Sequence, residues 1–265
     1  MKETLKQILS LVKNSNYLKL KNKNLFESEK ILSELNSNGF TIIENYYTEK
    51  KCNELIENIN ELIEQKIHLF KIDKNSNDFR LNGADLFSEK IKEFKEDKFL
   101  QDISDRFLQK KSSAFFTLAA KISEKKNSLG SGGDWHRDKP LPKQIKAMIY
   151  LTDVDKTNGP FEYLNNSDKW NSLIDGTLNF GLKDCQTRLD NSIIDSKFLK
   201  SRRYKKTTIT GKKGTLLLFN SFGIHRGAPL VNGNRFALTN YYYPEDLINR
   251  ESANMKNKFK IPILK

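Results

Sequence analysis

Residues 145–152 have the sequence Ile-Lys-Ala-Met-Ile-Tyr-Leu-Thr, and its alternation decides the fold. Successive side chains of a strand point to opposite faces of a sheet. One face is apolar, is expected to lie under helices, and consists of Ile145, Ala147, Ile149 and Leu151. The other should line the interior of a barrel and carries Lys146, Met148, Tyr150 and Thr152. An interior lysine and tyrosine need polar partners.

The chain around this strand divides into a helical part followed by a part made of strands. Helical spacing of apolar residues predicts helices over 2–14, 27–37, 49–67, 86–95 and 98–110. Polar residues predict a loop over 72–84. Besides 145–152, strands are predicted over 40–43, 114–123, 160–164, 205–210, 214–219, 223–227 and 235–243. This order is typical of an α+β chain whose second part is a β-sandwich or jelly roll.

The 265 residues are expected to form a single domain. We expect a mainly helical part over 1–112 and a jelly-roll core over 113–245. Within the core, 165–204 is long and irregular, which favours a lid or a substrate-binding insertion. Residues 246–265 are interpreted as a basic C-terminal tail.

The formal net charge of +13 is concentrated in the last quarter of the chain. Residues 1–196 contain 31 Lys and Arg against 30 Asp and Glu, whereas residues 197–265 contain 15 against 3. One interpretation is that these cations are solvated surface residues. The other is that they attract an anionic substrate or polymer.

Several features bear on where the protein works. The N-terminal residues show no signal-peptide pattern, and no apolar run is long enough to cross a bilayer. Cys52 and Cys185 lie far apart, without the spacing of metal ligands. A cytoplasmic location is therefore predicted. The sequence indicates no oligomeric state.

Two of the three histidines could share a metal with one carboxylate. His136 and Asp138 form a His-x-Asp pair, and residues two apart on an extended segment point to the same side. His225 would reach the same point from another strand, and Arg235 follows ten residues later. Two imidazoles and one carboxylate on one face of an iron leave positions open for substrates and dioxygen. His68, at the end of a predicted helix, is interpreted as a capping or surface residue.

The segments that hold these residues resemble the phytanoyl-CoA dioxygenase family of iron(II)- and 2-oxoglutarate-dependent oxygenases. The resemblance extends over roughly residues 30–245. It is carried by LNSNGFTII (35–43), DWHRDKP (134–140), KQIKAMIYLTDVDKTNGPFEYLNNSDK (143–169) and GTLLLFNSFGIHRGAPLVNGNRFALTNYYYP (214–244). It implies a double-stranded β-helix, a form of jelly roll, with N-terminal helices packed on its major sheet. At 165–169 the chain reads Asn-Asn-Ser-Asp-Lys where the family often has Gly-Ser-His-Lys.

The resemblance also implies roles for individual residues. His136, Asp138 and His225 would bind Fe(II), and Arg235 would pair with the distal carboxylate of 2-oxoglutarate through its planar guanidinium. Dioxygen would be the third reactant, and succinate and carbon dioxide the co-products. Family halogenases lack the carboxylate ligand, so Asp138 argues for oxygen insertion.

Further contacts are predicted from position alone. Lys146 and Tyr150, on the interior face of their strand, are expected to contact 2-oxoglutarate. Trp135, Arg137 and Arg80 are candidates for contact with the substrate. Arg137 stands between two ligands, so its side chain should point away from the iron.

The expected substrate is a small metabolite with an unactivated C–H bond, and an anionic one is favoured by the charge. Two alternatives stay open. An oxygenase acting on nucleic acid would explain the basic C-terminal quarter, but the sequence contains no established nucleic-acid motif, so this partner is not favoured. A jelly-roll binding protein without catalytic activity is disfavoured by the complete set of His136, Asp138, His225 and Arg235.

Overall fold

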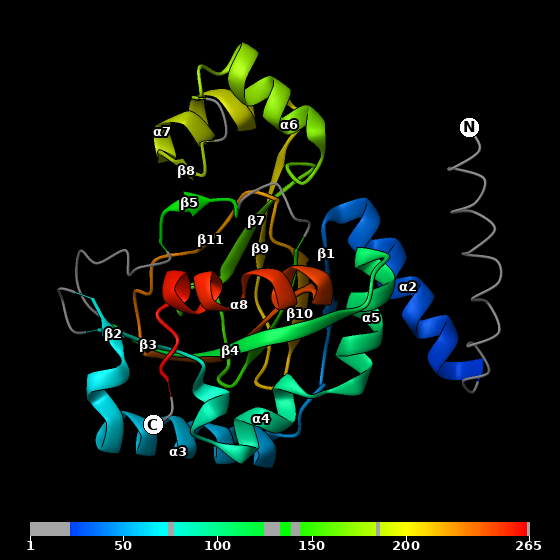
Figure 1. Cartoon of the computed structure of the whole chain (residues 1–265). Helices are drawn as coiled ribbons and strands as arrows, with labels where there is room; N and C mark the ends of the chain where they lie inside the picture. The colour runs from blue at the N-terminus through cyan, green and yellow to red at the C-terminus, as the bar shows by residue number, and fades with distance from the viewer. Residues whose placement is uncertain (1–21, 74–76, 125–132, 139–143, 184–185, 264–265) are drawn as a thin grey trace.

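The computed structural model describes residues 22–73, 77–124, 133–138, 144–183 and 186–263, so the helix expected over 2–14 lies outside it. Two antiparallel sheets form a jelly roll, with helices along one side and an insertion on the opposite side (Figure 1). The expected fold class, an α+β double-stranded β-helix with N-terminal helices on its major sheet, is confirmed.

The larger sheet has seven strands in the order β1-β10-β6-β12-β4-β3-β2. Their bounds are β1 (Phe40–Ile43), β2 (Lys71–Ile72), β3 (Asp78–Asn82), β4 (Ser112–Ser123), β6 (Ile145–Tyr150), β10 (Leu216–Asn220) and β12 (Asn234–Pro244). The apolar face of β6 and the adjoining Leu151 join the core shared with the helices. On the interior face, Met148 and Tyr150 pack between the sheets. The alternation predicted for this strand is therefore confirmed.

The smaller sheet has five strands in the order β8-β5-β11-β7-β9. Their bounds are β5 (Trp135–His136), β7 (Phe161–Asn165), β8 (Arg188–Leu189), β9 (Lys205–Ile209) and β11 (His225–Gly227). Aromatic and aliphatic side chains fill the space between the two sheets and include Phe40, Tyr150, Phe161, Tyr163, Ile209, Leu217 and Phe219. This core brings β6 and β12 opposite the strands that carry the histidines.

The apolar face of the larger sheet is covered by helices α2 (Asn22–Asn38), α3 (Glu49–Lys66), α4 (Glu89–Lys95) and α5 (Lys98–Leu108). Helix α3 begins after Thr48, whose side chain caps it by accepting a hydrogen bond from the backbone N–H of Lys51. Its buried residues are Cys52, Leu55, Ile59 and Leu62. Each buried leucine or isoleucine contributes about 1.5–3 kcal/mol through burial. This packing holds the larger sheet in place beneath the site.

The prediction of a loop over 72–84 is wrong, because β3 lies within it. Strand β3 pairs with β4 at residues 118–122. Its sequence is polar because Asp78, which is buried, accepts a hydrogen bond from Nε of Arg80 at 2.8 Å. The two polar side chains satisfy each other inside the fold, so the apolar pattern expected of a strand is missing.

The insertion expected over 165–204 contains short helices and one strand. Helix α6 (Trp170–Ile174) and helix α7 (Asn191–Ile193) are each continued by an irregular helical turn, and β8 lies between them. Their apolar side chains form a separate core with Trp135 and Ile224. The insertion is thereby fixed to the outer side of the smaller sheet.

The segment interpreted as a basic tail contains α8 (Glu245–Phe259). Phe259 lies 5.0 Å, between ring centroids, from Phe116 of β4 and 5.9 Å from Tyr241 of β12. The helix is therefore part of the packed fold and crosses in front of the large sheet (Figure 1). Within the described ranges, no helix is long and apolar enough to span a membrane.

Candidate active site

The two histidines meet because their strands are neighbours. His225 of β11 stands directly opposite His136 of β5, and their ring centroids are 4.4 Å apart. The backbone N–H of Asp138 donates to the carbonyl of Ser221 at 2.9 Å. This bond ties the segment after β5 to the loop before β11, so the three residues predicted as ligands converge from segments far apart in the sequence.

Each imidazole is oriented by a backbone carbonyl two residues earlier in the chain. Nδ1 of His136 lies 2.8 Å from the carbonyl oxygen of Asp134, and Nδ1 of His225 lies 2.7 Å from that of Gly223. A carbonyl can only accept, so both Nδ1 atoms carry the proton. Both Nε2 atoms then have a free lone pair, which is the state required of a metal ligand.

Burial keeps both histidines neutral. Burial lowers the pKa of His136 to about 4, although the Asp134 carbonyl and the Asp138 carboxylate oppose this. Burial, together with His136, lowers the pKa of His225 well below its usual value. Neither ring has to lose a proton before it binds a metal near neutral pH.

Asp138 is ionised and forms a salt bridge. Burial acts to raise the pKa of its carboxyl group. Lys146 and the two histidines lower this pKa by a larger amount, so the net shift is downward. Its Oδ2 lies 2.6 Å from Nζ of Lys146. This ammonium group also lies 4.2 Å from the centroid of the Tyr241 ring, and the pKa of Lys146 is raised because Asp138 and Tyr241 outweigh its burial.

The three donors do not yet form a complete metal site. Within the described residues, no group of three His, Cys, Asp or Glu side chains is arranged to hold a metal as it stands. The Asp138 carboxylate already forms a salt bridge with Lys146. The donor set nevertheless suits iron, because it offers two neutral imidazoles and one carboxylate in the charge states that the metal requires.

Arg235 is a buried cation surrounded by glycines. Its side chain makes no ion pair or hydrogen bond with another described residue, and burial lowers its pKa. A Cβ added at Gly227 would lie 3.1 Å from Nη2 of Arg235, and one added at Gly159 would lie 3.4 Å from Nη1 and only 2.8 Å from the carbonyl of Ala228. The glycines therefore keep open a space at the guanidinium, and a carboxylate could fill it.

Tyr150 reaches the same interior, but its hydroxyl is already engaged. It donates to the carbonyl of Ile209 and accepts from the backbone N–H of Phe161, both at 3.0 Å. The hydroxyl therefore links β6 to the smaller sheet, and one acceptor position is left for a further partner.

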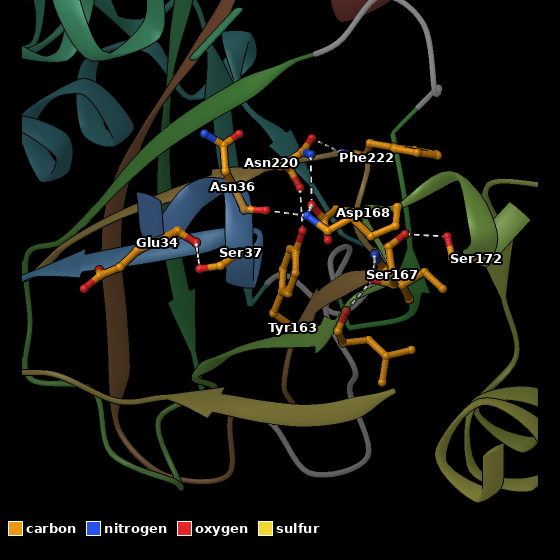
Figure 2. Close-up of polar contacts among 12 residues, drawn as sticks. Glu34, Asn36, Ser37, Tyr163, Ser167, Asp168, Ser172, Asn220 and Phe222 are labelled. Atoms are coloured by element: carbon orange, nitrogen blue, oxygen red, sulfur yellow. Dashed lines mark hydrogen bonds and ion pairs between the residues drawn. The ribbon is translucent and has the colours of Figure 1, made fainter. Parts of the chain in front are cut away.

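A buried polar network supports the loop that precedes His225 (Figure 2). The Tyr163 hydroxyl donates to the carbonyl of Asn220 at 3.0 Å. The Ser167 hydroxyl accepts from the backbone N–H of Ile224 at 2.6 Å. A Cβ added at Gly223 would lie 1.8 Å from the Tyr163 hydroxyl oxygen, so only glycine fits beside this ring.

The residues predicted to contact the substrate occupy different surroundings. Trp135 is buried in the insertion core, with the Arg226 guanidinium carbon 4.6 Å from the centroid of its ring. Arg137 is also buried, and its Nη1 donates to the Ser172 hydroxyl at 3.2 Å. Its Nε and Nη2 have no hydrogen-bond partner among the described residues. Arg80 lies at the border of a surface groove.

Sequence reasoning missed two groups of residues. The first is the backbone carbonyls that orient the histidines, since no side-chain pattern reports them. The second is Arg188, which pairs with His136 across β8 and β5 in a strand of two residues. A strand this short gives no periodic signal.

Comparisons with known proteins identify similar sequences and folds. Residues 35–236 match the family described as Phytanoyl-CoA dioxygenase (PhyH). The comparison with curated protein sequences gave no match.

Three solved structures illustrate the similarity of the fold. The non-heme alpha ketoglutarate dependent carbocyclase SnoK from nogalamycin biosynthesis is 14% identical, with 85% of each chain covered and a TM-score of 0.63. HygX from Streptomyces hygroscopicus, with nickel, 2-oxoglutarate and hygromycin B bound, is 15% identical over 85% of this chain and 88% of that chain (TM-score 0.58). EctD from S. alaskensis with bound Fe is 14% identical over 82% of this chain and 76% of that chain (TM-score 0.64).

Proposed function

Because the chain belongs to the phytanoyl-CoA dioxygenase family and is a 2-oxoglutarate-dependent non-haem iron oxygenase, we propose that it hydroxylates an unactivated C–H bond of a small metabolite. Iron(II) is its cofactor, and 2-oxoglutarate and dioxygen are its co-substrates. When bound, the iron and 2-oxoglutarate supply the oxidising chemistry, and succinate and carbon dioxide are released. The chain's residues supply position, charge and exclusion of water.

We assign iron binding to His136, Asp138 and His225. The observation that carries the assignment is the pair of opposed imidazoles, each with its Nδ1 proton fixed by a carbonyl. Asp138 can supply the third donor once its contact with Lys146 is exchanged for the metal. A complete set that includes this carboxylate favours hydroxylation over halogenation.

We propose that Arg235 binds the distal carboxylate of 2-oxoglutarate. The guanidinium is buried and unpaired among the described residues, and the glycines beside it leave room for a carboxylate. Such a bidentate pair is strong in a site shielded from water. When iron binds the Asp138 carboxylate, the Lys146 ammonium group loses its present partner. It would then pair with a carboxylate of the same co-substrate. Tyr150 stays a proposed contact, in which its hydroxyl would donate to the co-substrate in place of the Ile209 carbonyl.

Aromatic rings packed against His225 exclude water from one side of the proposed site. The centroids of Phe161 and Phe219 lie 5.4 Å and 5.2 Å from that of the His225 imidazole. Aromatic side chains at these distances strengthen the electrostatic contacts of the neighbouring charges, because they lower the local dielectric constant. They also restrict a substrate to the opposite side of the imidazole.

The function is tested by adding Fe(II) and 2-oxoglutarate to the protein without oxygen and recording its visible spectrum. A charge-transfer band of the iron chelate is expected in the wild type and should be lost in His225→Ala. His68→Ala is the matched control, because His68 is an exposed histidine that is not among the proposed iron or 2-oxoglutarate ligands. Folded wild-type protein without the band would overturn the assignment, and so would a band that survives in His225→Ala.

A further inference from the structure

A surface groove of about 730 Å³ lies between the edge of the large sheet, β8 and the end of α8. Its lining comes from segments far apart in the sequence, which meet only in the folded chain. The lining residues that carry the argument are Lys71, Arg188, Tyr241, Lys258 and Lys260. No aspartate or glutamate is among the described residues that line the groove.

Four cations of this groove lack an anionic partner in the described part of the chain. They are Lys71 of β2, Arg188 of β8, Lys258 of α8 and Lys260, which follows α8. A fifth cation, Arg80, is paired with Asp78. Elsewhere on the surface many lysines have carboxylates nearby, as in the pairs Lys110–Asp246 and Lys212–Asp153. Several unpaired like charges in one concave site raise the local concentration of anions.

The groove adjoins the proposed iron site through two of its lining residues. Arg188 pairs directly with His136 across β8 and β5. The Tyr241 ring lies 4.2 Å, centroid to Nζ, from Lys146, whose ammonium group holds Asp138. A molecule whose charged end occupies the groove can therefore extend another part towards the metal ligands.

We propose that this groove binds the phosphate-bearing end of a multiply charged substrate. The inference rests on the proposed function, since it names the substrate class of the same site. Four unpaired cations exceed what a single carboxylate would balance, and three of the four are lysines, which bind phosphate as point charges. Leu118 and Phe259 line the same groove and provide apolar contact for the C–H-bearing part.

The charge of the groove is tested by calorimetric titration of the full-length protein, without added metal, with inorganic pyrophosphate at low salt. The test variant is Arg188→Gln combined with Lys258→Gln. The matched control is Lys50→Gln combined with Lys90→Gln, which removes the same charge from exposed positions on α3 and α4. Pyrophosphate should bind the wild type and the control equally and bind the test variant at least about ten-fold more weakly. No binding to the wild type, or an equal loss in both variants, would overturn the proposal.

The substrate class is tested by succinate formation from 2-oxoglutarate. Phosphorylated metabolites should stimulate it in the wild type, and the same molecules without phosphate should not. The test variant should lose this stimulation and keep the anaerobic charge-transfer band. Stimulation by the dephosphorylated molecules alone would overturn the proposal and leave the oxygenase assignment intact. A missing band in the wild type would instead overturn the proposed iron site, whatever the pyrophosphate result.

Discussion

The ammonium group of Lys146 lies 2.6 Å from Oδ2 of Asp138, so the carboxylate proposed as a metal ligand already has a buried cationic partner. A metal that binds Asp138 must displace this contact or share the carboxylate with it. Iron binding and the Lys146 salt bridge are therefore linked equilibria.

Lys146→Met should destabilise the metal-free protein more than the iron-loaded protein. Without the cation, the half-buried carboxylate loses its partner, at a cost of about 1–3 kcal/mol. Iron replaces that partner, so the rise in Tm on anaerobic addition of Fe(II) should be larger in Lys146→Met than in the wild type. Lys146→Arg keeps the charge and is the control. Equal rises in Lys146→Met and the wild type would contradict the linkage.

Arg235→Lys should weaken 2-oxoglutarate binding without loss of iron binding. Lysine keeps the charge but loses the planar fork, and the loss of one charged hydrogen bond corresponds to about a ten- to hundred-fold change in Kd. The measurement is a titration of the charge-transfer band with 2-oxoglutarate. Arg106→Lys, on the outer helix α5, is the control and should bind as the wild type does. An unchanged Kd in Arg235→Lys would remove Arg235 from the co-substrate site.

Gly223→Ala should reduce both stability and iron affinity. The new methyl group would overlap the Tyr163 ring, and overpacking of this kind costs about 1–3 kcal/mol or more. The same displacement moves the carbonyl that orients His225. Urea unfolding and Fe(II) titration measure the two effects. In a Tyr163→Leu background the cost of Gly223→Ala should fall, because the ring that it meets is absent. A full cost in that background would show that the overlap is not its cause.

Cys52 should resist alkylation in the folded protein well into the alkaline range. Its side chain is fully buried, and burial raises its pKa from 9.0 to about 11, although Lys213 opposes the shift. Since the folded pKa is the higher one, this thiol contributes stability that is complete below pH 9 and is lost as the pH rises through about 11. Mass spectrometry of the Cys52 peptide after iodoacetamide treatment at pH 8, with and without urea, checks this. Equal labelling in both conditions would contradict it.

The sequence predicts well those parts of the fold that have a regular apolar pattern. Helix α3 was predicted with its observed first residue and to within one residue of its end, and β1 with its observed bounds, because regular apolar spacing is a local signal. Strand β3 was missed because Asp78 and Arg80 satisfy each other, and the composition then looks like that of a loop. The strand itself is defined by its pairing with β4, which forms only when the sheet has assembled.

The candidate site could be predicted only in part for a similar reason. Alternation along β6 predicts that Lys146 faces the interior of the barrel. It does not predict which residue Lys146 contacts there, and in the structure that residue is Asp138. Arg188 and Lys258 were not predicted to lie near the site, because β8 and α8 meet there only through tertiary packing. The charge count was compatible with an anionic ligand as well as with solvated surface cations, and it did not show where a ligand would bind.

The carbonyls of Asp134 and Gly223 have a consequence for how this site can evolve. They fix the histidine tautomers through main-chain atoms, which every residue type provides. Most substitutions at Asp134 would therefore leave the orientation of His136 unchanged, whereas Gly223 is constrained by the Tyr163 ring beside it. Position 134 should therefore vary freely among descendants of this chain, whereas position 223 should remain glycine.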